Sequence, residues 1–106
     1  MLSGKQRRYL RGLGHSLAPI VQLGKDGVTE GVVGALDTAL SDHELIKVKL
    51  AQVIAPEQEA IAPELATRCK AELVGEIGHT LLYYRRHPHE PKIVLPRATK
   101  RAARDE

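Results

Sequence analysis

The sequence contains no phenylalanine and no tryptophan, and it has only three tyrosines. Its hydrophobic core must therefore be built from aliphatic side chains. Proteins that read single-stranded RNA often stack bases on aromatic rings. Because this chain has few rings to offer, any binding of nucleic acid should rest on contacts to the sugar-phosphate backbone.

Cysteine and long apolar stretches are also scarce. Cys69 is the single cysteine, which excludes an internal disulfide framework. No apolar run approaches the roughly 18 residues of a membrane-spanning helix, and residues 1–8 lack the apolar centre of a secretory signal. A length of 106 residues suits one domain. We therefore expect a single-domain cytoplasmic protein.

Positive charge is unevenly distributed, although the net charge is only +3. Residues 1–25 carry a net charge of +5, residues 26–76 one of −6, and residues 77–106 one of +4. Two basic ends around an acidic middle favour a surface that binds a polyanion, with phosphate the usual target. The alternative, ordinary solvated charge, stays open on this pattern alone.

The spacing of apolar residues predicts seven elements. Helices are expected at 3–14, 29–40 and 56–70, and strands at 20–23, 44–53, 73–77 and 80–85, with a further edge strand at 92–95. Pro63 should kink the third helix or divide it into two short helices. Helices between the early strands favour parallel pairing, and the last strands can pair antiparallel. The expected fold is α/β, a compact α-β-α-β-α-β-β sandwich with a four-stranded mixed sheet.

The first predicted helix has two different sides. Ser3 is a suitable N-cap. At about 100° per residue, one side, expected to face the core, carries Leu2, Tyr9, Leu10 and Leu13, and the other carries Arg7, Arg8 and Arg11. An arginine stripe suits phosphates because the guanidinium offers several donors in one plane. It would serve equally well as a solubilising face.

Two later elements also sort their residues by side. In strand 44–53, Lys47 and Lys49 share one face, which should reach water in part, whereas Ile46, Val48 and Leu50 point to the other. In helix 56–70, the side expected to be buried carries Ile61, Leu65 and Cys69.

The motif Gly24-Lys25-Asp26-Gly27 lies between a predicted strand and a helix that Thr29 should cap. Two glycines three residues apart suit a tight turn and let a sugar-phosphate backbone approach without Cβ clashes. The following helix N-terminus offers N–H groups and partial positive charge to a phosphate. The motif has neither P-loop nor dinucleotide-binding spacing. A plain turn is the competing interpretation.

The sequence offers little support for a metal site or a catalytic site. The five histidines and Cys69 show no zinc-type spacing. Cys69 belongs to an apolar helix side, where a thiol is usually inert, and no serine nucleophile motif or HExxH is present. We therefore expect no enzymatic activity, no metal and no cofactor.

Three segments resemble the CRM domain (chloroplast RNA splicing and ribosome maturation), most closely its bacterial stand-alone form, the YhbY family. They are residues 10–50, the stretch VGEIGHTLLYYRR at 74–86, and KIVLPR at 92–97. The resemblance implies a fold similar to the C-terminal domain of bacterial translation initiation factor three. It also implies RNA binding and association with precursors of the large ribosomal subunit.

The resemblance also assigns positions. The family's GxxG loop falls on residues 24–27, its helix start on Thr29-Glu30-Gly31, and its Tyr-Arg strand end on Tyr84 and Arg85. The chain departs from the family pattern at three positions. Lys70 stands where glycine often closes the third helix, Pro63 lies inside that helix, and Asp26 puts a negative charge in the loop.

The combined interpretation is a monomeric, non-enzymatic RNA-binding protein that acts in assembly of the large ribosomal subunit and binds structured ribosomal RNA. Residues 1–97 form its CRM-type domain, and 98–106 form a charged, disordered tail. The candidate RNA-binding residues are Gly24, Lys25, Asp26, Gly27, Thr29, Arg7, Arg8, Arg11, Lys47, Lys49, Arg85 and Arg86. The alternative is a protein-interaction adaptor whose acidic middle docks a basic partner such as a ribosomal protein.

Overall fold

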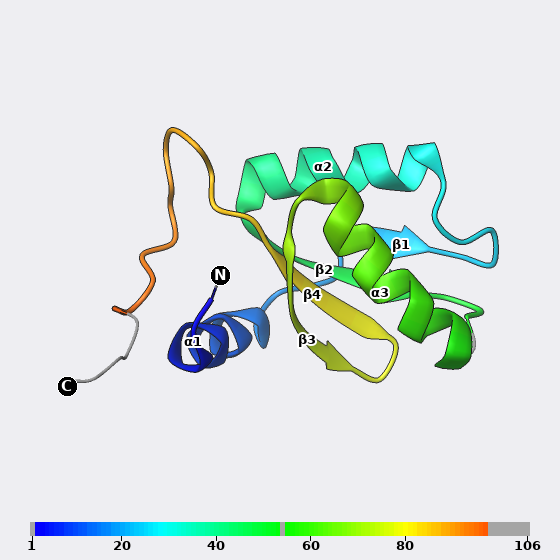
Figure 1. Ribbon diagram of the computed structural model, residues 1–106, viewed down its shortest axis with the longest axis horizontal. Helices are drawn as coiled ribbons and strands as arrows, with labels where there is room; N and C mark the ends of the chain where they lie inside the picture. The colour runs from blue at the N-terminus through cyan, green and yellow to red at the C-terminus, as the bar shows by residue number, and fades with distance from the viewer. Residues whose placement is uncertain (1, 54, 98–106) are drawn as a thin grey trace.

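The computed structural model describes residues 2–53 and 55–97 (Figure 1). Its elements follow the predicted order: α1 (Gly4–Gly14), β1 (Val21–Leu23), α2 (Glu30–His43), β2 (Leu45–Leu50), α3 (Ala55–Cys69), β3 (Glu72–Ile77) and β4 (Thr80–Tyr84). The predicted α/β sandwich is thereby confirmed. The predicted tail, 98–106, lies outside the described residues. Among the described helices, none is both long and apolar enough to span a bilayer.

The four strands form one mixed sheet in the order β1-β2-β4-β3. β1 pairs in parallel with β2, to which α2 connects it, and β4 pairs antiparallel with both β2 and β3. The mixed pairing agrees with the prediction. β4 lies between β2 and β3. One end of β2 therefore lies beside the turn of the β3-β4 hairpin, and the other end lies beside the open end of that hairpin.

Helices cover the two faces of the sheet unequally. In Figure 1, α2 and α3 lie over one face and α1 alone lies over the other. Ile46, Val48 and Leu50 are buried in the core under α2 and α3, whereas Leu45 belongs to the smaller core under α1. The predicted alternation in β2 is confirmed, and it places Lys47 and Lys49 on the face that α1 covers.

The first helix begins with a complete capping box. The backbone N–H of Gln6 donates to the Ser3 hydroxyl over 3.1 Å, and the Gln6 side chain accepts from the backbone N–H of Ser3 over 3.0 Å. Leu10 is fully buried. Tyr9 and Leu13, however, are 42% and 37% exposed, so the predicted apolar side is narrower than expected. α1 therefore contacts the sheet along one narrow line.

The third helix is continuous from Ala55 to Cys69 with Pro63 inside it, so the alternative of two short helices is wrong. Residues on both sides of Pro63 are packed against the sheet, including Ile61 and Leu65, which are buried as predicted. The Tyr83 hydroxyl also donates to the carbonyl of Ala62 over 2.7 Å. These contacts hold the helix together although proline removes one backbone hydrogen bond.

The C-terminal segment does not form the predicted edge strand at 92–95. The Glu44 carboxylate accepts the N–H groups that a strand would use, from Lys92 over 2.8 Å and from Ile93 over 2.7 Å. It also accepts the N–H of His87 over 2.8 Å. The segment instead runs beside α1, and Ile93 and Leu95 pack against the smaller core (Figure 1).

Glu44 occupies the junction of α2 and β2 with only 1% of its surface exposed. Its φ of 66° lies in the left-handed region, which ends α2 and starts β2 in a new direction. Burial opposes ionisation, but the three N–H donors outweigh it and lower the pKa of the Glu44 carboxyl. Glu44 is therefore a buried carboxylate satisfied by backbone donors.

Replacing Glu44 by Gln should lower the free energy of unfolding by about 2 kcal/mol at pH 7, because an amide cannot accept all three N–H groups. The folded-state pKa of Glu44 is lowered. Its stabilisation is therefore complete above the ordinary glutamate pKa of about 4.3 and is lost as the pH falls through the lower folded value. The difference between Glu44→Gln and wild type should shrink in acid.

Urea unfolding at several pH values measures this difference. Glu59→Gln removes an exposed carboxylate from α3 and is the matched control. Equal stability of the two variants at neutral pH would contradict the role of Glu44.

Candidate nucleic-acid interface

The glycine loop is a tight turn at the end of β1. The N–H of Gly27 donates to the carbonyl of Gly24 over 3.0 Å, and Gly27 has a φ of 72°, which favours glycine. Open space surrounds the position of a Cβ at either glycine. Lys25 and Asp26, between them, are exposed. The loop thus offers an accessible backbone with one lysine and one aspartate at its tip.

The helix start after the loop is capped as predicted. The Thr29 hydroxyl accepts the N–H of Val32 over 3.2 Å. Glu30 follows in the first turn and pairs with Arg68 over 2.7 Å. One N–H group is thus already used, and a carboxylate stands beside the others. This helix start therefore offers a phosphate fewer free N–H groups and less positive charge than an uncapped helix N-terminus would.

The sheet face under α1 is left partly open at the loop end. α1 ends at Gly14, which packs tightly against Leu82, because a Cβ there would lie 2.9 Å from a Leu82 methyl carbon. Beyond this point, one residue from each strand lies in a single row of paired residues across the sheet: Gln22, Lys49, Thr80 and Ile77. Lys49 is exposed and Ile77 is 65% exposed. This open row lies beside the glycine loop.

A small hollow of about 30 Å³, which we call the groove, lies between the end of α1 and the sheet. Arg11 and His15 line one side, and Lys47 and Thr80 line the other. The Arg11 side chain crosses β3 at Gly75, where a Cβ would lie 3.1 Å from its Cδ, and reaches the carbonyl of Val74 over 3.4 Å. Apolar parts of the lining side chains form the wall of the groove, and the charges of Lys47 and Lys49, which form no ion pair with the described residues, lie around it.

The predicted arginine stripe of α1 is divided by the fold. Arg7 pairs with Glu72 over 3.0 Å and donates to the carbonyl of Leu73 over 2.9 Å, so it joins α1 to β3. Arg8 is exposed and forms no ion pair with the described residues. Arg11 lies along the groove. The three arginines therefore have three different environments.

The remaining predicted residues lie at the opposite end of the sheet. Arg85 follows β4, whose last residue, Tyr84, pairs with the first residue of β2. Its guanidinium donates to Asp37 over 2.7 Å, to Ser41 over 3.0 Å and to the carbonyl of Cys69 over 2.8 Å. Arg86 is exposed. The twelve candidates thus do not share one place: the loop residues and Lys49 lie toward one end of the sheet, and Arg85 and Arg86 lie at the other, where Arg7 also pairs with Glu72.

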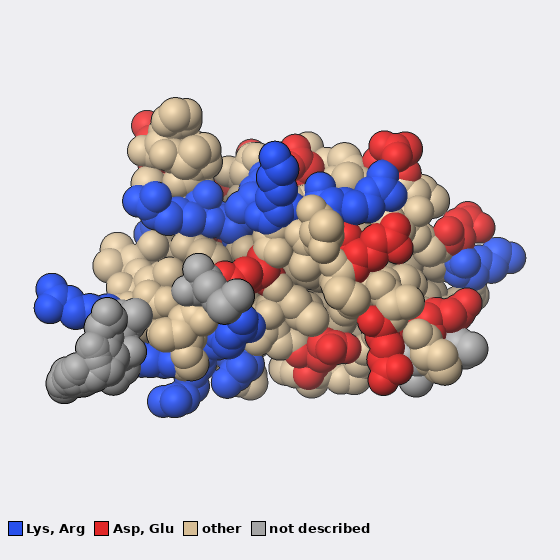
Figure 2. Space-filling model, viewed as in Figure 1, with Lys and Arg blue, Asp and Glu red and all other residues tan. Residues whose placement is uncertain are grey.

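Charge of the two signs is separated on the surface in Figure 2. Acidic side chains gather over α3, and basic ones gather over α1 and around the C-terminal end of α3. The charge asymmetry of the sequence therefore persists in space. The acidic area lies on the sheet face opposite the groove.

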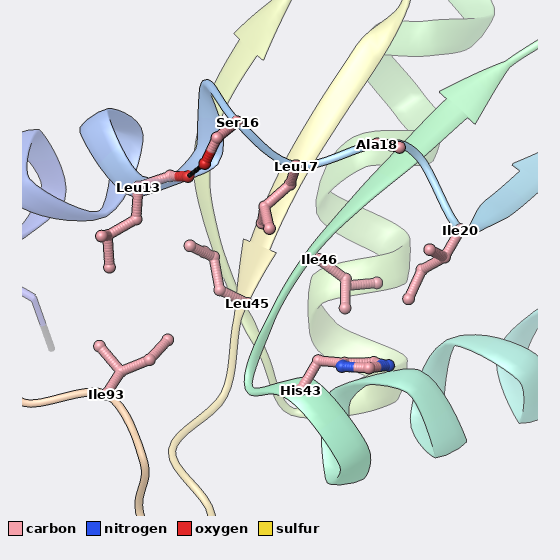
Figure 3. A pocket seen from close by; sticks show the side chains of 9 residues that line it. All are labelled: Leu13, Ser16, Leu17, Ala18, Ile20, His43, Leu45, Ile46 and Ile93. Carbon is pink, nitrogen blue, oxygen red and sulfur yellow. Dashed lines mark hydrogen bonds between the residues drawn. The ribbon is translucent and has the colours of Figure 1, made fainter.

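A different hollow, of about 430 Å³, is apolar (Figure 3). Leu13 approaches it from the last turn of α1, Leu17 and Ile20 approach it from the connection to β1, and Leu45 and Ile93 approach it from the other side. Among the described residues that line it, His43 is the one ionisable group. None of the twelve candidate residues lines it, so it does not extend the basic groove.

The described residues contain no cluster of side chains that suits a metal ion. Within residues 2–53 and 55–97, no group of three or more metal-binding side chains comes together. Cys69 is buried as predicted, and burial raises the pKa of its thiol, which opposes thiolate formation.

Four residues that matter here were not among the twelve predicted site residues. His15 lies in the groove, Glu44 anchors the C-terminal segment, and Lys70 and Tyr84 line a hollow at the far end of the sheet. The family resemblance had singled out Lys70, as the replacement of a glycine, and Tyr84, as the end of a strand, but it gave neither a role in binding. The others depend on contacts between distant segments.

Comparison with known proteins shows which protein family this chain resembles. The sequence model of the CRS1/YhbY (CRM) domain matches residues 2–85. An RNA-binding protein of Haemophilus influenzae is 46% identical over 91% of this chain and 96% of its own length. A probable RNA-binding protein of Pseudomonas aeruginosa is 40% identical over 86% of this chain and 88% of its own length.

A solved structure agrees with these sequences. The solution structure of a hypothetical protein of Staphylococcus aureus, proposed to bind RNA, superposes with a TM-score of 0.79. It is 40% identical and covers 91% of this chain and all of its own length. The match of fold, sequence and family model, which confirms the resemblance seen in the sequence, shows that the chain belongs to the CRS1/YhbY (CRM) domain family.

Proposed function

We propose that this protein binds structured RNA in precursors of the large ribosomal subunit and assists assembly in the cytoplasm as a monomer, without catalysis. The glycine loop and the basic surface beside it make the contact. One observation carries the proposal: the exposed Lys25 lies in the loop that follows β1, and Lys47 and Lys49, which form no ion pair with the described residues, lie on β2, the strand beside β1.

Unpaired lysines favour a polyanionic ligand. Lys47 and Lys49 are two residues apart on one strand, which separates their Cα atoms by about 7 Å along the sheet. Phosphates that approach this surface would release counterions, which drives binding at low salt. The membership of the CRM family and the names of the relatives support RNA as the polyanion.

The surface favours contacts with the backbone and the shape of RNA over reading of bases. Tyr83 and Tyr84 are buried, which leaves Tyr9 as the only partly exposed tyrosine. The open row offers Gln22, Thr80 and Ile77 instead of rings. Structured RNA, whose backbone has a fixed shape, therefore suits this surface better than an unstructured strand.

Crosslinking of the protein to RNA in cells, followed by sequencing of the bound fragments, tests the proposal. Fragments of large-subunit precursors should dominate. The acidic surface over α3 favours a second candidate, an adaptor that docks a basic ribosomal protein. Recovery of such a protein that excess RNA fails to displace, with no crosslinked RNA, would favour the adaptor and contradict the proposal.

Affinity for RNA should fall steeply with salt, by about 10² or more between roughly 50 and 200 mM, if four to six cations are engaged. The double variant Lys25→Gln/Lys49→Gln should bind more weakly and flatten the slope of log K against log salt by about 1.4 to 1.8. Titrations of fluorescent RNA at several salt concentrations measure both effects.

The control Lys5→Gln/Lys92→Gln removes the same charge away from the groove. It should change the slope less than the groove variant does. Equal slopes for the two double variants would show that the charge acts without regard to position.

The loop should supply selectivity. Asn and Asp have nearly the same shape, and both tolerate the left-handed φ of Gly27 better than other side chains do. Gly27→Asp should therefore repel an approaching phosphate and lose the preference for native RNA over an unrelated RNA, whereas Gly27→Asn should keep most of it.

Competition between the two RNAs, with the melting temperature of each variant as a folding check, measures this preference. A folded Gly27→Asp protein that selects native RNA as well as Gly27→Asn does would show that the loop is only a turn.

A further inference from the structure

A further hollow, lined by several charged residues, lies at the end of the sheet away from the glycine loop. It has a volume of about 380 Å³ and is bordered by α1, by the turn that ends α3 and by the end of β4. Lys70, Tyr84, Arg85 and Arg86 line it, together with Glu72. The hollow therefore brings three cations and one carboxylate around a tyrosine.

Tyr84 lines this hollow and carries an unusual group, its hydroxyl. It is buried and finds no hydrogen-bond partner among the described residues. Buried hydroxyl groups nearly always have a partner, so an unpaired one calls for an explanation. Burial raises the pKa of the Tyr84 hydroxyl, and the nearby Glu44 raises it further. The hydroxyl therefore remains protonated and can donate a hydrogen bond.

Lys70 has an unfavourable backbone conformation. Its φ of 53° lies in the left-handed region, where glycine usually closes a helix. Ala71 donates to the carbonyl of Ala66 over 2.9 Å, which is the backbone closure that such a residue serves. A lysine kept there at the cost of strain indicates a use for its side chain.

The ion pairs around the hollow leave two cations free. Glu72 is compensated by Arg7 over 3.0 Å and accepts the N–H of Leu2 over 3.0 Å. Arg85 is compensated by Asp37. Lys70 and Arg86 are exposed and have no ion pair with the described residues. The net charge that faces the hollow is therefore positive.

We propose that this hollow binds a phosphate group. Lys70 and Arg86 compensate its charge. The Tyr84 hydroxyl, which has almost no exposed surface in this structure, donates to one of the phosphate oxygens once the side chains that cover it move aside. The phosphate belongs either to an RNA backbone, in which case the site rests on the proposed function and gives RNA a second contact at the far end of the sheet, or to free phosphate. The chemistry of recognition is the same for both sources.

Lys70→Gly and Tyr84→Phe test the site. Glycine removes the cation and relieves the left-handed strain, so this variant should melt no lower than wild type. Phenylalanine removes only an unpaired hydroxyl, so it too should fold. Lys92→Ala, which removes an exposed lysine outside the hollow, is the control.

Two probes distinguish the sources of phosphate. Inorganic phosphate is titrated while backbone amide NMR signals of residues 70–72 and 84–86 are followed, and structured ribosomal RNA is titrated separately. Each variant should weaken binding of at least one probe by roughly tenfold, the effect of losing one charged hydrogen bond. The Lys92→Ala control should leave both unchanged.

Loss of RNA binding alone assigns the site to the RNA backbone, and loss of phosphate binding assigns it to free phosphate. Two folded variants that bind both probes like wild type would overturn the proposal. The phosphate titration needs no RNA binding, so failure of the proposed function would appear in the RNA titration alone and leave this site testable.

Discussion

The buried carboxylate of Glu44 fixes the arrangement on which both basic regions depend. It accepts backbone N–H groups of His87, Lys92 and Ile93 while its own backbone ends α2 and begins β2. A segment more than forty residues away is thereby held beside α1. Ile93 and Leu95 then complete the core beneath that helix, and the Gln6 side chain donates to the carbonyl of Pro96 over 3.0 Å. The position of α1 on the sheet follows from these contacts.

The position of α1 decides where the sheet stays open. The helix covers Leu82 and Tyr84, and its last residue, Gly14, is pressed against Leu82. The loop-end row of the sheet is left uncovered, and Lys49 lies in that row. A longer helix would hide this lysine, and a shifted one would close the groove between Arg11 and Lys47. The basic groove is thus a consequence of helix length and of tight packing at one glycine.

The fold could be predicted from the sequence because its signals are local: alternation in β2, Ser3 and Thr29 as N-caps, and glycines at the loop. The edge strand at 92–95 was wrong because Glu44 takes its N–H groups, a contact across forty-eight residues that no local pattern contains. The arginine stripe was only partly informative. Arg7 is used to bind Glu72, and its partner could be identified only once β3 was placed beside α1.

The arginine and lysine side chains have different roles, which follow from their different chemistry. Arg7, Arg68 and Arg85 all hold ion pairs, and two of them also donate to backbone carbonyls. The planar guanidinium suits such combined contacts because it donates in several directions. Lysines supply most of the unpaired charge near the loop, where a compact ammonium on a flexible stem can follow a phosphate backbone. The net charge of +3 therefore understates the positive charge available for binding, since the paired arginines offset acids within the fold and the lysines of the described residues form no ion pair there.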